Sequence, residues 1–194
     1  MAPEFPDVPT PIPPTIRRAR KDDAGAIRKI YNEAVRTTTA TFDTEPRSFS
    51  NQLAWLAEHD ARHPVLVAEL DHVVVGWASL SPWSDRRAYD GTAETSVYVG
   101  GAWRGRGVGR ALLSRLLSEA ARCKFHTLLA RIAVGNPVSR TLHVSAGFSS
   151  VGVMHEVGYK FHQLLDVELL ELSLETDGED SGGKTARTHP RATS

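Results

Sequence analysis

The sequence predicts an α/β fold built on a mixed sheet, and three observations point to it. Apolar runs rich in β-branched residues come first, at 65–70 and 73–80, and strand-like runs then alternate with amphipathic segments. The composition, with 41% hydrophobic and 24% charged residues, is ordinary for a globular protein. The 194 residues suit one domain, which buries about 70% of the surface that its unfolded chain exposes.

The folded domain is expected to span residues 15–175. Residues 1–14 contain six prolines, which lack a backbone donor and fix φ, so we expect a disordered Pro-rich arm. Residues 176–194 are rich in Gly, Ser, Thr and charge and have almost nothing to bury. This composition predicts a disordered tail.

The domain is expected to begin with a short strand at 15–20 and a helix that Asp22 caps. Apolar side chains at helical spacing mark this first helix, namely Ile27, Ile30, Tyr31 and Val35. A second helix is predicted over about 50–60. The runs 65–70 and 73–80 predict a β-hairpin because only Asp71-His72 separates them.

The second half of the domain is expected to alternate strands and helices. Its longest helix is amphipathic and carries Leu112, Leu113, Leu116, Leu117 and Ala120. The remaining predicted elements are strands at 95–99, 128–134, 149–158 and 164–174, and a short helix at 138–146.

Charge and targeting signals exclude several classes of partner. Lys plus Arg equals Asp plus Glu at 23 each, so no net charge draws the molecule toward nucleic acid or an anionic membrane. The N-terminal segment lacks the basic start and apolar stretch of a signal peptide, and no run has the length of a membrane helix. We therefore expect a cytoplasmic protein without nucleic-acid or membrane partners.

The cysteine and histidine content predicts no metal site. Cys123 is the single cysteine, so it forms no internal disulfide and builds no thiolate zinc site alone. His59 and His63 are four residues apart, but Pro64 argues against a shared helical face.

A glycine-rich turn is predicted between the strand at 95–99 and the longest helix. Its glycines let backbone amides approach a ligand closely, and the helix N-terminus adds free N–H donors and positive potential. This combination suits a pyrophosphate. The residues expected to take part are Arg104, Gly105, Arg106, Gly107, Val108, Gly109 and Arg110.

Several interpretations of this turn compete. A Walker loop requires Gly-Lys followed by Ser or Thr, which the segment lacks. A dinucleotide fingerprint would place its third glycine on Arg110, and Arg131 stands where that motif prefers an acidic residue. Arg104, Gly107 and Gly109 match [Arg/Gln]-x-x-Gly-x-[Gly/Ala], which resembles the acyl-CoA signature of GNAT acetyltransferases. A tight turn with solvated arginines remains the structural alternative.

Other segments extend this resemblance to the phosphinothricin acetyltransferase-like branch of the GNAT superfamily, over roughly 15–172. These segments occur in the expected order and comprise Thr41 to Pro46, Pro82-Trp83, Ala88 to Asp90, Thr92 to Val99, Asn136 to Phe148, Val157 to Phe161 and Asp166-Val167. The resemblance implies the GNAT fold, with a mostly antiparallel twisted sheet and helices on both faces. It also implies acetyl-CoA as co-substrate and a homodimer.

The resemblance implies a cofactor site along the strand that precedes the glycine turn. In this family that strand splays away from its neighbour and pairs with the pantetheine arm, which here implicates Val97, Tyr98 and Val99. Residues Arg104 to Arg110 would then hold the pyrophosphate. Asn136 would bind the CoA arm, cap the following helix, or do both.

Two residues are implied as catalytic. Glu94 matches the family's proposed general base, which takes a proton from the acceptor ammonium directly or through water. His143 stands where the branch has a histidine beside the CoA sulfur, and imidazole can donate to a leaving thiolate or relay a proton. The structural alternatives are a surface glutamate at a strand start and a histidine packed on a helix.

Four residues align with the family's acceptor region, namely Phe42, Trp83, Arg86 and Tyr89. Aromatic walls give a pocket its shape, and an arginine can bind a phosphinate or carboxylate with two hydrogen bonds. Core packing for Phe42 and Trp83, and a solvated charge for Arg86, are the alternatives.

Two departures from the family pattern bear on the substrate. Ser84 and Asp85 follow Pro-Trp where relatives often place a basic residue, and His162 and Leu164 replace a glycine and a tryptophan. High phosphinothricin activity is therefore in question, and methionine sulfone or sulfoximine suits the sequence equally.

The sequence thus predicts an acetyl-CoA-dependent N-acetyltransferase for a small amino-acid-like amine, acting by direct transfer in a ternary complex. Acetylation of a protein N-terminus or lysine is one alternative, and it requires an open acceptor groove. A non-catalytic acyl-CoA-binding sensor is another, and it would bind acetyl-CoA without turnover.

Overall fold

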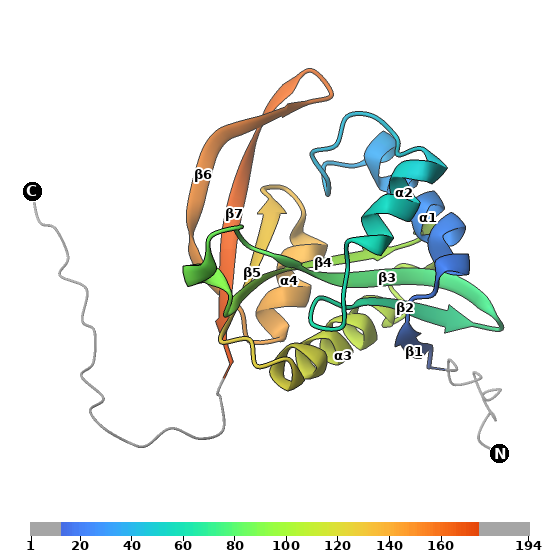
Figure 1. Ribbon diagram of the computed structural model, residues 1–194. Coiled ribbons are helices and arrows are strands. Elements are labelled where there is room, and N and C mark those ends of the chain that lie inside the picture. The colour runs from blue at the N-terminus through green and yellow to red at the C-terminus, as the bar shows by residue number, and fades with distance from the viewer. Residues whose placement is uncertain (1–12, 175–194) are drawn as a thin grey trace, which may run out of the picture.

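A computed structural model describes residues 13–174, and its centre is one seven-stranded sheet (Figure 1). The predicted arm over 1–14, except for residues 13 and 14, and the predicted tail over 176–194 lie outside the described residues. The sheet order is β1-β2-β3-β4-β5-β7-β6. The strands are β1 (Thr15–Arg18), β2 (Val65–Leu70), β3 (Val73–Pro82), β4 (Thr92–Val99), β5 (Thr127–Ala133), β6 (Ser149–Lys160) and β7 (Gln163–Ser173).

Neighbouring strands pair antiparallel except at one place, where β4 and β5 run parallel. A parallel pair needs a long crossover, and here the chain between β4 and β5 supplies it as a helix. The predicted mixed, mostly antiparallel sheet is confirmed.

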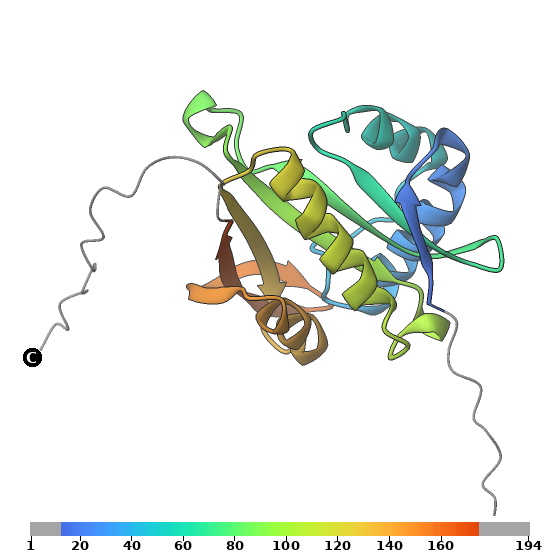
Figure 2. The same ribbon diagram turned by 90° about the horizontal axis from the view of Figure 1, so that it is seen from below.

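Among residues 13–174, four α-helices cover the two faces of the sheet (Figure 2). They are α1 (Ala24–Thr37), α2 (Phe49–Ala57), α3 (Val108–Arg122) and α4 (Pro137–Ser145), and short 3-10 turns lie at η1 (Lys21–Asp23), η2 (Arg87–Tyr89) and η3 (Gly101–Trp103). Within residues 13–174, no helix combines the length and the apolar character needed to cross a bilayer.

The side chains of strand β2 show which helix covers each face of the sheet. Leu66 and Ala68 pack into the cluster that contains α3, whereas Val65 and Val67 pack into the cluster that contains α1. Successive side chains of a strand point to opposite faces, so α3 covers one face and α1 the other. Burial on both faces explains why this strand is a continuous apolar run.

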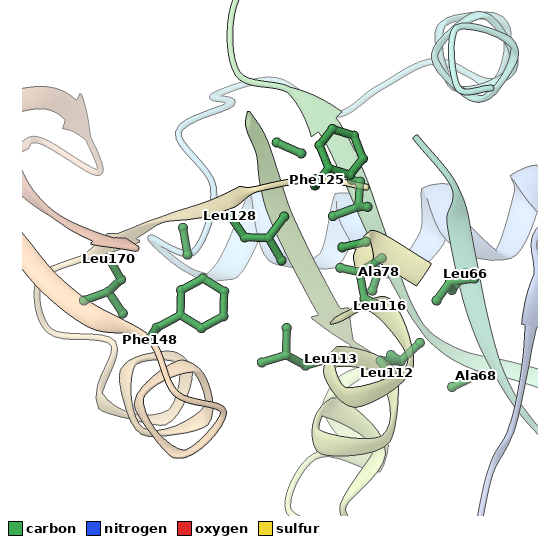
Figure 3. Packing of buried hydrophobic residues seen from close by; sticks show 14 of the residues in the cluster. Leu66, Ala68, Ala78, Leu112, Leu113, Leu116, Phe125, Leu128, Phe148 and Leu170 are labelled. Atoms are coloured by element: carbon green, nitrogen blue, oxygen red, sulfur yellow. The ribbon is translucent and has the colours of Figure 1, made fainter. Parts of the chain in front are cut away.

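The larger core lies between α3 and the sheet (Figure 3). Leu112, Leu113 and Leu116 of α3 are at most 1% exposed and face Ala78 and Leu128 of the sheet. These residues recur at the spacing predicted from the sequence, because one stripe of a helix must meet the sheet. This packing fixes α3, and therefore the position of its N-terminus.

Two predicted helix limits are wrong. Asp22 does not cap α1, because it lies in the turn η1 and the N-cap residue of α1 is Asp23. The Asp23 carboxylate accepts a hydrogen bond from Arg20 N, at the start of η1, at 2.7 Å. The second helix ends at Ala57 instead of 60, since Asp60 Oδ1 accepts the backbone N–H groups of residues 62 and 63 and forms a turn.

The hairpin predicted at Asp71-His72 is confirmed. Both residues have positive φ, 48° and 64°, as a type I′ turn requires at its two central positions. The β6–β7 hairpin turns in the same way at Phe161 and His162, with φ of 51° and 61°. His162 thus adopts the backbone conformation that a glycine would take more easily.

Candidate active site

The sheet opens between β4 and β5. Their ladder contains three residue pairs and ends where Glu94 meets Leu129. Beyond that point β4 still pairs with β3 as far as Val99, and β5 still pairs with β7 as far as Ala133. The facing edges of 95–99 and 130–133 therefore separate, and their backbone donors and acceptors are available to a ligand.

A large cavity lies against the opened end of β4. Its volume is about 1420 Å³, and its walls come from the end of α1, β4, the glycine turn, α3 and α4. Ten of the eleven residues predicted to bind the cofactor line it, namely Val97, Tyr98, Val99, Arg104, Gly105, Gly107, Val108, Gly109, Arg110 and Asn136. The structure thus brings these residues together around one space.

The glycine turn presents the N-terminus of α3 to this cavity. Gly105 and Gly107 have φ of 74° and 79°, a left-handed conformation that favours glycine. The first backbone hydrogen bond of α3 runs from Ala111 N to Gly107 O at 3.0 Å. The N–H groups of residues 108–110 precede it and have no partner within the helix, so they can bind an anion.

The three arginines of the turn have different surroundings. Arg104 is tied to the end of β4, because its Nε donates to Val99 O at 3.1 Å. Arg106 lies over the Trp103 ring at 5.1 Å and is the one predicted cofactor residue outside the cavity lining. Arg110, in the first turn of α3, lines the cavity. The mouth of the cavity is therefore positively charged.

Asn136 begins α4 at the far wall of the cavity. Its side-chain Oδ1 accepts from Ser139 N at 3.2 Å, so it is the N-cap of this helix. The predicted capping role is confirmed, and the cap holds Asn136 in the cavity wall.

Glu94 forms a two-bond ion pair with Arg131 at the last paired position of β4. Arg131 Nε donates to Oε1 at 2.7 Å and Arg131 Nη2 to Oε2 at 2.5 Å. The bond to Glu94 raises the pKa of Arg131 further above its usual range. The guanidinium also lies 5.5 Å from the centre of the Trp83 ring. Arg131 therefore links the Glu94 carboxylate to the aromatic side chain of Trp83.

His143 is buried in α4, with 3% of its surface exposed. Its Nδ1 lies 2.9 Å from Ser139 O, and a carbonyl oxygen only accepts, so Nδ1 carries a proton. Burial lowers the pKa of His143, and the bond to Ser139 opposes this shift. The imidazole is neutral, and its unprotonated Nε2 lies 3.5 Å from the Thr95 hydroxyl.

Glu94 and His143 approach the opening from opposite faces of the sheet. Thr95, which meets His143, follows Glu94 directly in β4, so their side chains point in opposite directions. The Thr95 hydroxyl also donates to Leu129 O at 3.2 Å. The hydroxyl has a single proton, so this threonine bonds β5 while its oxygen lies near His143 of α4 at the point where the ladder ends.

Phe42 lies in the loop after α1 and packs against β6. A Cβ atom added to Gly158 would stand 2.1 Å from the Phe42 ring, so only glycine permits this approach. Lys160 Nζ donates to Thr41 O at 2.7 Å, and the Tyr31 hydroxyl donates to Asp43 at 2.6 Å. These bonds hold the Phe42 loop between α1 and β6.

Burial shifts the pKa values of Tyr31 and Lys160, which hold the Phe42 loop. Burial, helped by the bond to Asp43, raises the pKa of Tyr31 to about 12. Burial lowers the pKa of Lys160, and Asp43 opposes that shift. The Tyr98 hydroxyl donates to Ala40 O at 3.2 Å and adds a further bond to the same loop.

The other two predicted acceptor residues are exposed. Arg86 precedes η2 and Tyr89 belongs to it. Within the described chain, no hydrogen bond or ring contact joins either residue to Glu94, Trp83 or Phe42. The structure therefore places Trp83 beside Glu94 through Arg131, but it leaves Arg86 and Tyr89 on the neighbouring loop.

The departures from the family pattern lie at two turns. Ser84 accepts from Arg86 N at 3.3 Å and so shapes the loop that follows Trp83. Leu164 follows the β6–β7 turn that contains His162, and 55% of it is exposed. Both departures change the surface near the predicted acceptor region and leave the sheet intact.

Comparison with known proteins assigns the family. The sequence profile described as the Acetyltransferase (GNAT) family matches residues 27–148. The chain belongs to the GNAT family of acetyltransferases. It is also similar to the L-methionine sulfoximine/L-methionine sulfone acetyltransferase of Salmonella typhimurium, with 44% identity over 83% of this chain and 95% of the relative.

Two further GNAT proteins show how far the similarity extends. The phosphinothricin N-acetyltransferase of Alcaligenes faecalis is 38% identical over 82% of each chain. The structure of yncA from Salmonella typhimurium with its cofactor acetyl-CoA has a TM-score of 0.81 at 40% identity, over 89% of this chain and 99% of that one. The predicted GNAT fold and enzyme class are confirmed.

Three residues of this GNAT site were missed from the sequence. Arg131 is a single charge within the apolar run 128–134, and such an isolated charge could have identified it. Thr95 and Lys160 lie in segments that carry the family resemblance, but their contacts were not predicted because their partners come from distant segments. Among residues 13–174, no group of three His, Cys, Asp or Glu side chains is arranged to hold a metal ion.

Proposed function

We propose that this chain is an acetyl-CoA-dependent N-acetyltransferase that acts on the amino group of a small amino-acid-like molecule. The observation that carries the proposal is the position of Glu94 at the end of the β4–β5 ladder, directly before the opened edge that lines the cavity. The names of relatives, which specify methionine sulfoximine, methionine sulfone and phosphinothricin, support the acceptor class.

The cavity residues suit CoA. The free N–H groups of 108–110 and the side chain of Arg110 fit a pyrophosphate, and the unpaired edge of 97–99 fits the amide groups of a pantetheine arm. When bound, acetyl-CoA supplies a thioester whose acetyl group passes to the amine as a C–N bond forms and the C–S bond breaks. The opened strands aim the arm past Glu94.

Two proton transfers accompany this reaction. Glu94 takes the first proton from the acceptor ammonium, which frees the nitrogen lone pair for attack. The second proton leaves the nitrogen as the amide forms. His143 Nε2, unprotonated in the neutral imidazole, takes it up and passes it to the leaving thiolate.

The position of the single cysteine supports direct transfer in a ternary complex as part of this proposal. Cys123 caps the C-terminal end of α3, opposite to the end that carries the glycine turn, and its Sγ lies 3.7 Å from Ala61 O. It is too far from the opened strands to carry the acetyl group. The amine itself is therefore the attacking group.

The acceptor binds on the Glu94 face in this proposal. Trp83 and Phe42 form its apolar walls, while Arg86 and Tyr89 border its entrance. Because Ser84 and the exposed Leu164 depart from the family pattern, we propose methionine sulfone and sulfoximine as acceptors alongside phosphinothricin.

A homodimer belongs to the same proposal. The β6–β7 hairpin lies at the edge of the sheet and exposes a group of large apolar side chains, namely Val151, Val153, Met154, Val157, Tyr159, Phe161 and Leu164. Edge strands with exposed apolar side chains pair readily with another chain. A second copy of this chain is the partner that we propose for this edge.

A panel assay tests the proposed function. Purified protein is incubated with acetyl-CoA and either L-methionine sulfone, L-methionine sulfoximine or L-phosphinothricin, and the N-acetyl product is measured by mass spectrometry. We expect turnover of the first two compounds. Binding of acetyl-CoA without product from any amine would instead identify a sensor, and product formed only on peptides would identify a protein acetyltransferase.

The variant Glu94→Gln tests the mechanism. Loss of a general base lowers kcat/KM roughly 100-fold or more, while acetyl-CoA binding measured by calorimetry stays unchanged. Glu168→Gln is the matched control, because Glu168 also pairs with an arginine, Arg140, but lies outside the site. Equal rates for Glu94→Gln and the wild type would remove Glu94 from the mechanism.

A further inference from the structure

The ion pair between Glu94 and Arg131 presents two opposite charges side by side at the proposed acceptor site. Both oxygens of Glu94 are engaged by the one guanidinium. The side chain of Arg131 is 53% exposed, whereas that of Glu94 is 17% exposed. A ligand entering from solvent therefore reaches the arginine before the carboxylate.

Arg131 is held by this site alone. In the part of the chain that the structure describes, its only acidic partner is Glu94, and its only ring contact is with Trp83. Neighbouring β5 residues Leu128, Ala130 and Ile132 point into the core on the other face. Arg131 therefore contributes little to packing of the core. It acts on Glu94 and on any ligand bound next to Glu94.

Glu94 must leave its ion pair with Arg131 before it can act as a base. While Glu94 accepts two hydrogen bonds from Arg131, neither oxygen is free to face an incoming ammonium without losing one of them. Breaking the pair without replacement would leave the Glu94 carboxylate, which is only 17% exposed, without a charged partner, which is costly. The ligand that opens the pair must therefore supply a negative group for Arg131 and a positive group for Glu94.

We propose that Arg131 binds the carboxylate of an amino-acid acceptor and thereby delivers the α-ammonium group of the same molecule to Glu94. This inference rests on the proposed function, because it concerns the acceptor of that reaction. An α-amino acid carries both charges on one carbon atom, so it replaces the internal pair with two new pairs. Every charge stays paired throughout the exchange.

The exchange has a consequence for release of the product. Acetylation turns the ammonium group into a neutral amide, which no longer pairs with a carboxylate. The N-acetyl product keeps its bond to Arg131 but loses its bond to Glu94. Glu94 releases to solvent the proton that it took from the ammonium and, as a carboxylate again, competes for the guanidinium, so that re-formation of the internal pair expels the product.

The experiment compares an acceptor with its own carboxamide, which lacks the negative charge but keeps the amine. L-methionine sulfone and its α-carboxamide are assayed with the wild type, Arg131→Ala, Arg131→Lys and Arg140→Ala. Arg140 is the matched control, since its side chain is also 53% exposed and also pairs with a glutamate, Glu168.

The measured quantity is the ratio of kcat/KM for the acid to that for the carboxamide. Arg131→Ala is expected to lower this ratio roughly 10- to 100-fold, which is the effect of losing one charge-assisted contact. The lower ratio should result from a higher KM for the acid. Arg131→Lys, which keeps the charge without the two-bond geometry, should lie between, and Arg140→Ala should match the wild type.

Each outcome separates the inference from the function on which it rests. If Arg131→Ala lowers the rates for both compounds equally, Arg131 only positions Glu94 and the inference is overturned. If the wild type turns over neither compound nor any amine of the panel, the proposed function fails first. Calorimetric binding of L-methionine sulfone to the CoA-loaded wild type, but not to Arg131→Ala, would support the inference without turnover.

Discussion

His143 shows how surroundings determine the chemistry of a single residue. Its ring packs edge-on against Phe148, with centroids 5.1 Å apart, and its Nδ1 proton is committed to Ser139 O. Burial lowers the pKa of His143 in the folded protein and outweighs the opposing bond to Ser139, whereas the unfolded chain carries a histidine with an ordinary pKa of about 6.5. The two states therefore bind different numbers of protons below neutral pH.

This difference predicts a pH dependence of stability. Below about pH 6.5 the unfolded chain binds a proton that folded His143 does not, so the free energy of unfolding falls as the pH is lowered. The variant His143→Gln lacks this group, and its stability should fall less between pH 7.5 and 5. Urea unfolding at a series of pH values measures the slope.

His72→Asn is the control for this series, because the side chain of His72 is 99% exposed and asparagine tolerates its positive φ. This variant should keep the wild-type slope. His59, whose pKa is also lowered by burial, contributes equally to all three proteins. An unchanged slope in His143→Gln would show that His143 titrates alike in the folded and unfolded states.

At the scale of elements, the glycine turn and α3 act as one unit. The leucines of α3 anchor the helix on the sheet, and the left-handed glycines at 105 and 107 bring its free N–H groups to the cavity. A Cβ at Gly107 meets no atom within 4 Å, so the demand for glycine comes from the backbone conformation.

Gly107→Ala is therefore expected to weaken acetyl-CoA binding without a large loss of stability. Alanine leaves the left-handed conformation in the free protein, and returning to it costs about 1–2 kcal/mol, or roughly 5- to 30-fold in affinity. Gly107→Asn should recover most of the affinity, because asparagine visits this conformation more readily. Calorimetry with acetyl-CoA measures both variants.

Gly25→Ala serves as the control for the added methyl group, since Gly25 lies within α1 and its Cβ would also meet no atom within 4 Å. It should bind acetyl-CoA like the wild type. If Gly107→Ala also bound with wild-type affinity, the backbone geometry of the turn would not be part of the acetyl-CoA site.

At the scale of the whole molecule, the two hairpins of the sheet, β2–β3 and β6–β7, differ. The β2–β3 turn projects one exposed apolar side chain, Val73, whereas the β6–β7 hairpin exposes seven. The hydrogen bond from Lys160 to Thr41 and the close packing of Phe42 on Gly158 link this hairpin to the acceptor region. Assembly through the hairpin would therefore also stabilise the acceptor side of the site.

Charge placed on the hairpin should dissociate the proposed homodimer. Val157→Lys puts an ammonium group into the buried interface, which lowers the affinity of the two copies strongly. Val73→Lys is the matched control, because both valines are 53% exposed. Sedimentation velocity should show a dimer for the wild type and Val73→Lys and a monomer for Val157→Lys. A monomeric wild type would overturn the dimer proposal.

The sequence by itself determined the features that depend on neighbours in the chain. The turn at Asp71-His72 follows from the preference of its residues for positive φ, and the leucine stripe of α3 follows from the helical period. The glycine turn was predicted at the residues that line the cavity for the same reason, since its conformation depends on a few consecutive residues.

The tertiary structure alone determined which distant residues meet. Arg131 reaches Glu94 across 37 residues, and Lys160 reaches Thr41 across 119, because the register of the sheet places them together. Likewise, the alternation of β4 puts Glu94 and the His143 contact on opposite faces. Strand register and packing are properties of the whole sheet, so no local pattern in the sequence encodes these contacts.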